Sequence, residues 1–186
     1  MIAINFQPFP NLETDRLFLR RVSSTDVEGM FALRSNPETM QYVPRPLATS
    51  KEDILVHIAM IDEKIESNIG INWAITMKGN PKLIGIIGHY KISIENQRAE
   101  IGYMLLPEFH GKGIITEAIK VVVKYGFEEM QLHSIEAVID PRNYGSEKAL
   151  QKSGFVKEAH LLENEFYDGE FLNTVIYSLL KRNYRH

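Results

Sequence analysis

Hydrophobic and polar positions along the chain predict strands and helices in a mixed order. Residues 16–22 alternate apolar and charged side chains, which is typical of a half-buried strand. Residues 25–35 carry apolar side chains at helical spacing. A second helix is expected after Ser50, which with Asp53 forms a box-like cap. Three strands separated by short turns follow, which predicts an antiparallel meander over residues 71–77, 82–93 and 99–106.

The pattern becomes most clearly helical in the second half of the chain. Residues 113–130 place apolar side chains in the rhythm of one helix face, and residues 134–140 read as a strand. A strand, a long helix and a strand in succession predict a parallel, right-handed crossover. Asn143 or Ser146 begins a shorter helix that ends at Gly154, and two long strands around a Tyr-Asp-Gly turn close the chain. The fold class is therefore α+β, a mixed α/β arrangement with a mostly antiparallel sheet.

Composition and charge narrow the kinds of function. With 186 residues, 44% of them hydrophobic and 24% charged, the chain suits one globular domain spanning 1–186. A net charge of -3 does not favour nucleic acid as a partner. The absence of cysteine excludes disulfides, thiolate metal sites and cysteine nucleophiles. No apolar run approaches the ~20 residues that cross a bilayer, so we expect no membrane partner and a cytoplasmic location.

The histidines give no sign of a metal site. None of the four that we considered lies four residues from another on an expected helix, and no acidic cluster accompanies them. We therefore expect no metal. The four are His89, His110, His133 and His160.

A glycine-rich turn joins the third strand of the meander to the long helix. Gly111 and Gly113 come directly before the helix, whose first N–H groups lack internal partners and carry the positive end of the dipole. Such a turn can cradle a phosphate. The P-loop pattern is missing, and a dinucleotide fingerprint fails because Thr116 occupies its third glycine position.

The same turn resembles the phosphate motif of the GNAT superfamily of acyl-CoA-dependent N-acyltransferases, Q/R-x-x-G-x-G/A. His110 and Ile115 depart from the pattern at its first and last positions, whereas Gly113 matches its central glycine. The longer run AEIGYMLLPEFHGKGIITEAI is similar to the RimJ/RimL-like branch of that superfamily, the ribosomal-protein N-terminal acetyltransferases. Asn143-x-x-Ser146 and the opening and closing segments ETDRLFLRRVSSTDVEGMF and DGEFLNTVIYSLLKRNY extend the resemblance over nearly the whole chain.

The resemblance implies a single GNAT domain whose sheet is splayed at a central parallel strand pair, here 99–106 and 134–140. Acetyl-CoA would lie in that opening as the acyl-donor co-substrate. Pantetheine amides would pair with main-chain groups of Met104, Leu105 and Leu106, and backbone N–H groups would hold the pyrophosphate. The implied cofactor-binding residues are Met104, Leu105, Leu106, His110, Gly111, Lys112, Gly113, Ile114, Ile115, Thr116, Asn143 and Ser146.

The implied reaction is attack of a free amine on the thioester, which needs a neutral amine, a stabilised carbonyl oxygen and a protonated leaving thiolate. A main-chain N–H near Leu105 is the candidate oxyanion donor. Ser146 is the candidate acid, with Tyr144 as an alternative, and Asn143 would fix pantetheine; helix capping by Asn143 and Ser146 is the competing structural interpretation. Glu100 is the candidate base through water, or else a carboxylate that ties the sheet together.

The acceptor is predicted to be a protein N-terminal α-amine. Its pKa of about 7.7–8.0 leaves a useful neutral fraction, whereas a lysine near 10.4 costs roughly 3 kcal/mol more. A small amine (an amino acid, an aminoglycoside or a polyamine), a CoA-binding module without turnover and an NAD-binding protein are the alternatives. An acidic hairpin would either be a solvated edge or attract a cationic acceptor; it carries Glu163, Glu165, Asp168 and Glu170. Either a monomer or a homodimer is compatible with the sequence.

Overall fold

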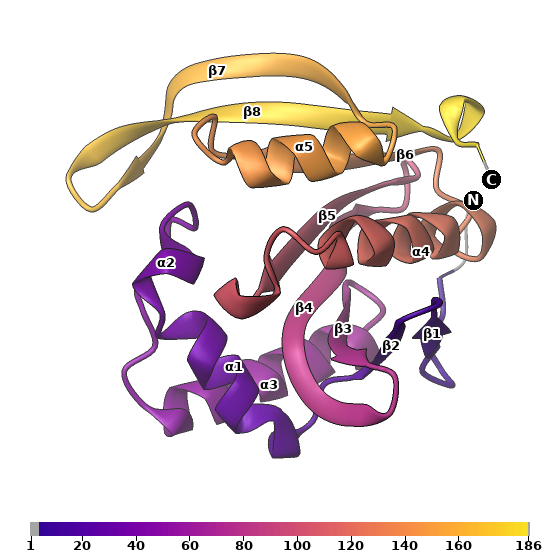
Figure 1. The fold of residues 1–186 in the computed structure, drawn as a ribbon. Helices are drawn as coiled ribbons and strands as arrows, with labels where there is room; N and C mark the ends of the chain where they lie inside the picture. Colours follow the sequence, from indigo (N-terminus) through magenta and orange to yellow (C-terminus); the bar gives the residue numbers. More distant parts are fainter. Residues whose placement is uncertain (1–3, 186) are drawn as a thin grey trace.

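The computed structural model describes residues 4–185 as one eight-stranded sheet with helices packed on it (Figure 1). None of the helices in this range is long and apolar enough to cross a bilayer. Short 3₁₀ helices lie at Ser24–Asp26, Pro107–Phe109 and Lys181–Asn183. The strands and α-helices are β1 (Leu12–Glu13), β2 (Leu17–Arg21), α1 (Val27–Arg34), α2 (Pro37–Met40), α3 (Lys51–Glu66), β3 (Ile71–Met77), β4 (Asn80–Ser93), β5 (Arg98–Leu105), α4 (Ile114–Glu128), β6 (Ser134–Ile139), α5 (Tyr144–Lys152), β7 (Val156–Tyr167) and β8 (Glu170–Leu180).

The sheet has the order β1-β2-β3-β4-β5-β6-β8-β7, and its neighbours are antiparallel except for β5 and β6. The expected α+β class with one parallel pair is therefore confirmed. The meander β3-β4-β5 and the closing hairpin β7-β8 each follow the chain, whereas β6 enters between β5 and β8 through the crossover helix α4.

One short element, β1, was not predicted. β1 is only two residues long, too short for any hydrophobic period to register. The sequence predicts a loop over residues 36–49 with room for one helical turn, and α2 is that turn. The side chain of Asn36 caps it by accepting hydrogen bonds from the N–H groups of Glu38 and Thr39. The capping box of Ser50 and Asp53 at the start of α3 is confirmed.

Helices cover both faces of the sheet, and successive residues of β4 face them in turn. His89 contacts α4, where its Nε2–H donates to the carbonyl of Val122 at 3.1 Å. Tyr90, the next residue, faces a cavity lined by His57 and Lys64 of α3 on the other side. Trp73 is fully buried on the α4 face, where its ring meets Tyr125 edge-on at 5.3 Å.

The parallel pair β5 and β6 is joined over only three residue pairs, from Arg98 with Ser134 to Glu100 with Glu136. Arg98 closes this end, because its guanidinium donates to Glu136 Oε2 at 2.7 Å and to Ser178 Oγ at 3.1 Å. Beyond Glu100 the rest of β5 pairs with β4 alone, and the rest of β6 with β8 alone. The expected splay between these strands is therefore present.

His89 makes stability sensitive to pH. Burial lowers its pKa to about 4, against a hydrogen bond to Val122 that raises it, and Nδ1 has no partner. The unfolded chain binds a proton below its ordinary pKa of 6.5, so stability is lost as the pH falls from 6.5 toward 4. Between pH 7 and pH 5 this residue should cost about 2 kcal/mol of unfolding free energy.

Urea unfolding at both pH values measures this loss. His89→Gln keeps a donor for Val122 and removes the titrating ring, so its unfolding free energy should depend less on pH than that of the wild type. The same pH dependence in both proteins would contradict the assignment to His89.

Candidate active site

Two cavities meet where β5 and β6 part. The first, which we call the glycine-loop cavity, measures about 490 Å³ and lies between the glycine turn, α4 and α5. The second, the α3 cavity, measures about 530 Å³ and extends toward α3 on the other side of the splay. Both cavities are lined by Tyr42, Val43, Tyr103, Met104, Asn143 and Ser146. A molecule in one cavity can therefore reach a molecule in the other through the splay.

The main-chain groups that face the splay differ in part from those expected. The Leu106 N–H donates to the Ile84 carbonyl at 2.9 Å and so is already satisfied by the β4 side. Because antiparallel pairing alternates, Met104 also directs its N–H and carbonyl toward β4, opposite Ile86. Tyr103 and Leu105 are then the residues whose main-chain groups point into the splay. Of the three expected residues, Leu105 has this orientation, whereas Met104 and Leu106 face β4.

The expected phosphate cradle has the required local geometry. Gly111 and Gly113 adopt left-handed conformations with φ of 71° and 73°, which favour glycine. Gly113 caps α4 without any side-chain hydrogen bond, so the N–H groups of the first turn have no protein acceptor from a cap. Ile114, Ile115 and Thr116 of this turn line the glycine-loop cavity. Free N–H donors at the positive end of a 15-residue helix fit a diphosphate.

A partly exposed hydrogen-bond network that the sequence did not reveal holds the glycine turn in place. Glu117 accepts hydrogen bonds from Thr14 Oγ1 at 2.5 Å and from Arg16 Nε at 2.7 Å. Arg16 in turn donates to the carbonyl of Lys112 at 3.1 Å. Burial raises the pKa of Glu117, but the hydrogen bonds from Thr14 and Arg16 together hold it below the ordinary value. Glu117 is therefore an ion-paired anchor that fixes the turn to the β1–β2 segment.

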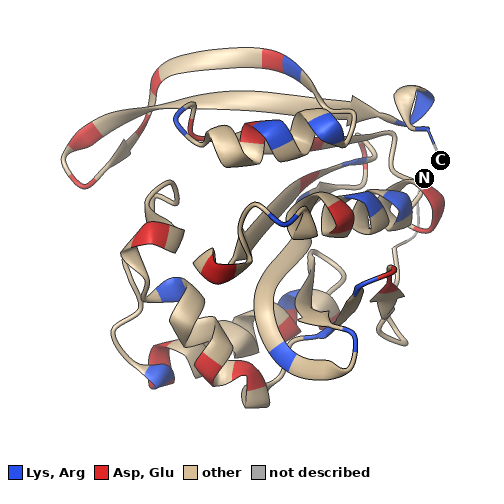
Figure 2. Cartoon of the chain, in the orientation of Figure 1, with Lys and Arg blue, Asp and Glu red and all other residues tan. Residues whose placement is uncertain are grey.

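The lysines that line the glycine-loop cavity come from α5. Lys148 and Lys152 lie four residues apart on this helix and line the glycine-loop cavity. Figure 2 shows Lys or Arg positions in blue along α5, which lies beside α4. Lys112, which the resemblance placed in the cradle, instead folds back to donate to the Glu108 carbonyl at 2.7 Å and lies over the ring of Phe109. Helical spacing contained the signal for the two α5 lysines, but only the fold brings α5 to α4.

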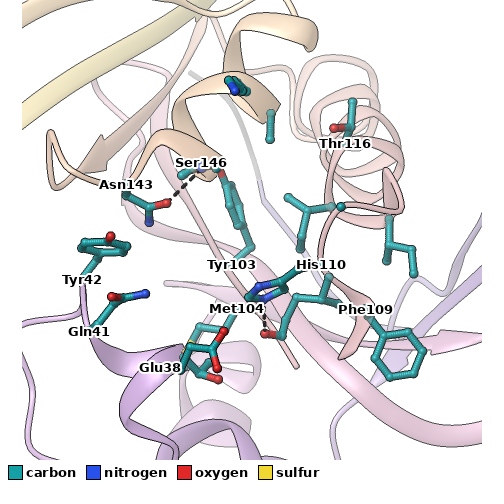
Figure 3. A pocket seen from close by; sticks show the side chains of 18 of the residues that line it. Glu38, Gln41, Tyr42, Tyr103, Met104, Phe109, His110, Thr116, Asn143 and Ser146 are labelled. Carbon is teal, nitrogen blue, oxygen red and sulfur yellow. Dashed lines mark hydrogen bonds between the residues drawn. The ribbon is translucent and has the colours of Figure 1, made fainter. Parts of the chain in front are cut away.

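The splay is bordered by a hydrogen-bonded trio. Tyr103 Oη and Ser146 Oγ are 2.6 Å apart, and Asn143 Oδ1 accepts a hydrogen bond from the Ser146 N–H at 3.0 Å (Figure 3). Asn143 is thus the cap of α5, as one structural interpretation of the sequence held. Burial raises the pKa of Tyr103 to about 12, although the bond to Ser146 opposes this. The phenol is therefore protonated at neutral pH and able to donate.

The other two candidate catalytic residues lie differently. Tyr144 is 67% exposed and lines neither cavity, so the phenol that the structure brings to Ser146 is that of Tyr103. Glu100 lines the α3 cavity at the apex of the splay, with its side chain 17% exposed. Its Oε2 accepts from Lys91 Nζ at 2.6 Å, which agrees with a carboxylate that ties two neighbouring strands.

His110 occupies the first position of the phosphate motif and forms a hydrogen bond with β5 at the splay. Its Nε2 donates to the Leu105 carbonyl at 2.9 Å, and Figure 3 shows its ring beside Met104. This bond satisfies one of the two Leu105 main-chain groups that face the splay and leaves the N–H. Within residues 4–185 no group of three or more His, Asp or Glu side chains is arranged to hold a metal ion.

The fold and this site are those of a CoA-dependent acyltransferase. The family model described as "Acetyltransferase (GNAT) domain" matches residues 16–156. The chain belongs to this family of N-acetyltransferases, and acetyl-CoA is supported as its co-substrate.

Similar proteins agree on the fold and differ in what their names say. "Uncharacterized N-acetyltransferase YoaA" of Bacillus subtilis is 37% identical over 173 residues, covering 93% of this chain and 98% of the relative. The ribosomal-protein-S5-alanine acetyltransferase of Vibrio fischeri superposes with a TM-score of 0.83 at 23% identity, over 95% of this chain and 100% of that one. The spermidine N-acetyltransferase of Vibrio cholerae, solved with CoA and spermine, gives a TM-score of 0.81 at 23% identity, over 92% and 99%. At this identity the two solved structures show the fold alone.

Proposed function

We propose that the protein transfers an acetyl group from acetyl-CoA to a primary α-amine, with a protein N-terminus as the leading acceptor. The observation that supports this most is the opening between β5 and β6, which joins the glycine-loop cavity to the α3 cavity at Tyr103 and Ser146. Membership of the RimJ/RimL-like branch stays a prediction, because proteins of this fold include both ribosomal-protein and spermidine acetyltransferases.

In this proposal the chain's own groups bind the donor along the glycine-loop cavity. The N–H groups of residues 111–116 would hold the diphosphate, and Lys148 and Lys152 would offset its charge. The main-chain groups of Tyr103 would pair with pantetheine like an added strand, and the Leu105 N–H would remain for the thioester. Bound acetyl-CoA would supply an electrophilic thioester carbon and a thiolate leaving group.

The groups around the opening would then act on charge and protons. The Leu105 N–H would donate to the carbonyl oxygen as it gains negative charge. Tyr103 and Ser146, sharing one hydrogen bond, would leave one hydroxyl proton to donate to the departing sulfur. The amine proton would pass through water to Glu100, whose second oxygen is not engaged by Lys91.

A direct test is the release of free thiol from acetyl-CoA in the presence of three acceptor groups: peptides with free N-termini, amino acids and polyamines. The proposal expects turnover with α-amines and product acetylated at the α-nitrogen by mass spectrometry. It would be overturned if acetyl-CoA binds and no amine releases thiol, or if only side-chain lysines or polyamines are acetylated.

Glu100→Gln tests the proposed base. Because an α-amine is partly neutral near pH 8, loss of a water-mediated base should lower kcat/KM by about 10-fold at pH 7 and less at pH 9. The pH–rate profiles of the wild type and the variant give the comparison. An unchanged profile would remove Glu100 from the mechanism and leave it as the partner of Lys91 across β4 and β5.

A further inference from the structure

In the α3 cavity the carboxylates have ion-pair partners, whereas most of the cations do not. Both of its carboxylates are occupied, since Glu100 pairs with Lys91 at 2.6 Å and Asp140 pairs with Arg142 at 2.6 Å. Within residues 4–185, no carboxylate forms an ion pair with the other cations that line this cavity. They are Arg34, Arg45 and Lys64.

These three cations form one positive zone although they come from different parts of the chain. Arg34 lies at the end of α1, Arg45 in the loop after α2 and Lys64 in the last turn of α3. All three lower the pKa of His57, after the larger effect of its burial, to about 4. His57 is therefore neutral at pH 7 and offers no further charge. Burial, and then the neighbouring Arg45, also lower the pKa of the half-buried Arg34.

We propose that the amine acceptor carries an anionic group, a carboxylate or a phosphate, that Arg34 and its cationic neighbours hold in the α3 cavity. The inference rests on the proposed function, in which this cavity receives the acceptor. Burying part of a guanidinium without a carboxylate partner costs folding free energy. An anionic ligand can supply that partner through two parallel hydrogen bonds. A polyamine would bring more positive charge to the same place.

The charge also suits the chemistry of the attacking nitrogen. Positive charges near an ammonium group favour its loss of a proton, so the cations that remain unpaired help to keep the amine neutral. The acidic hairpin does not oppose this, because none of its four carboxylates lines the α3 cavity; they belong to Glu163, Glu165, Asp168 and Glu170. Asp168 and Glu170 instead line a neighbouring pocket together with Arg45 and Arg142.

Matched acceptors test the proposal with acetyl-CoA saturating. The peptides Ser-Asp-Ala-Ala-amide and Ser-Asn-Ala-Ala-amide differ in one charge, as do free aspartate and asparagine, and spermidine supplies the cationic comparison. We expect kcat/KM to favour the anionic member of a pair by about 10- to 100-fold, less at high salt. Preference within the peptide pair identifies a peptide acceptor, and preference within the amino-acid pair identifies a small one.

Variants then assign the preference to the cavity. Arg34→Gln should reduce the anionic-to-neutral ratio by about 10-fold, and Arg34→Lys should restore part of it. Lys64 is exposed, so Lys64→Gln provides a second test if Arg34→Gln does not fold. The matched control is Lys82→Gln, an exposed lysine that lines neither cavity and should leave the ratio unchanged.

Three results would overturn the proposal. If kcat/KM is the same for the anionic and the neutral acceptor of each pair, the proposal is contradicted and the proposed function still stands. A rise in the KM for acetyl-CoA, rather than for the acceptor, in Arg34→Gln would show that the cations serve the donor. Absence of turnover with every amine, while acetyl-CoA still binds, would overturn the proposed function itself and this inference with it.

Discussion

Tyr103→Phe should lower kcat by about 100-fold with little change in the KM for acetyl-CoA. The variant keeps the ring that packs beside the opening and removes the hydroxyl that lies 2.6 Å from Ser146 Oγ. Ser146→Ala should lower kcat to a similar degree. The fold-loss of kcat in the double variant should be smaller than the product of the two single fold-losses, because the hydroxyls act as one hydrogen-bonded unit. Steady-state kinetics with an accepted amine measures all three.

Tyr144→Phe gives the comparison for this prediction. Its phenol neighbours Asn143 in the sequence but is 67% exposed outside both cavities. A large loss of kcat in Tyr144→Phe together with normal kcat in Tyr103→Phe would restore the alternative acid that the sequence offered. A normal kcat in both Tyr103→Phe and Ser146→Ala would remove the hydroxyl pair from the mechanism.

Gly113→Val should weaken acetyl-CoA binding by about 100-fold. At φ 73° a β-branched side chain is strained, so the turn must rearrange and move the first N–H groups of α4. Loss of one or two hydrogen bonds to a charged phosphate, each about 1.5–3 kcal/mol, accounts for that factor. Isothermal titration with acetyl-CoA measures the change in Kd.

Gly79→Val is the matched control, because Gly79 has φ 79° in the turn between β3 and β4. A Cβ there meets nothing within 4 Å, and at Gly113 it meets only Arg16 Nη2 at 3.7 Å. Both variants should therefore lose similar stability in a thermal melt, and only Gly113→Val should lose affinity. Equal affinity in the two variants would contradict a diphosphate site at the start of α4.

The elements that follow from local pattern were predicted well. Residues 71–77 form β3 with the bounds expected, and the long helix expected over 113–130 is α4. Their periods of two and about 3.6 residues are written into adjacent side chains. The opening between β5 and β6 was predicted from the family resemblance alone. Local pattern could not predict it, because it depends on how far two segments more than 30 residues apart pair before they separate, and Arg98 holds their paired end together.

The site was predicted less completely for the same reason. Strand alternation assigns the open main-chain groups to Tyr103 and Leu105, but only the register with β4 fixes which parity faces the opening. The pairing of Tyr103 with Ser146 joins residues 43 positions apart, and no local signal marks it. The cationic zone draws on two helices and one loop, each of which looks like an ordinary charged surface in the sequence.

The proposed mechanism depends on Tyr103 and Leu105 having main-chain N–H groups that are open until the donor binds. Residue-resolved amide hydrogen exchange by NMR, with and without acetyl-CoA, tests this most directly. We predict that acetyl-CoA slows exchange at Tyr103, at Leu105 and in the first turn of α4, and leaves β8 unchanged. Exchange at Tyr103 and Leu105 that is already slow without acetyl-CoA, or that acetyl-CoA does not slow, would contradict the mechanism.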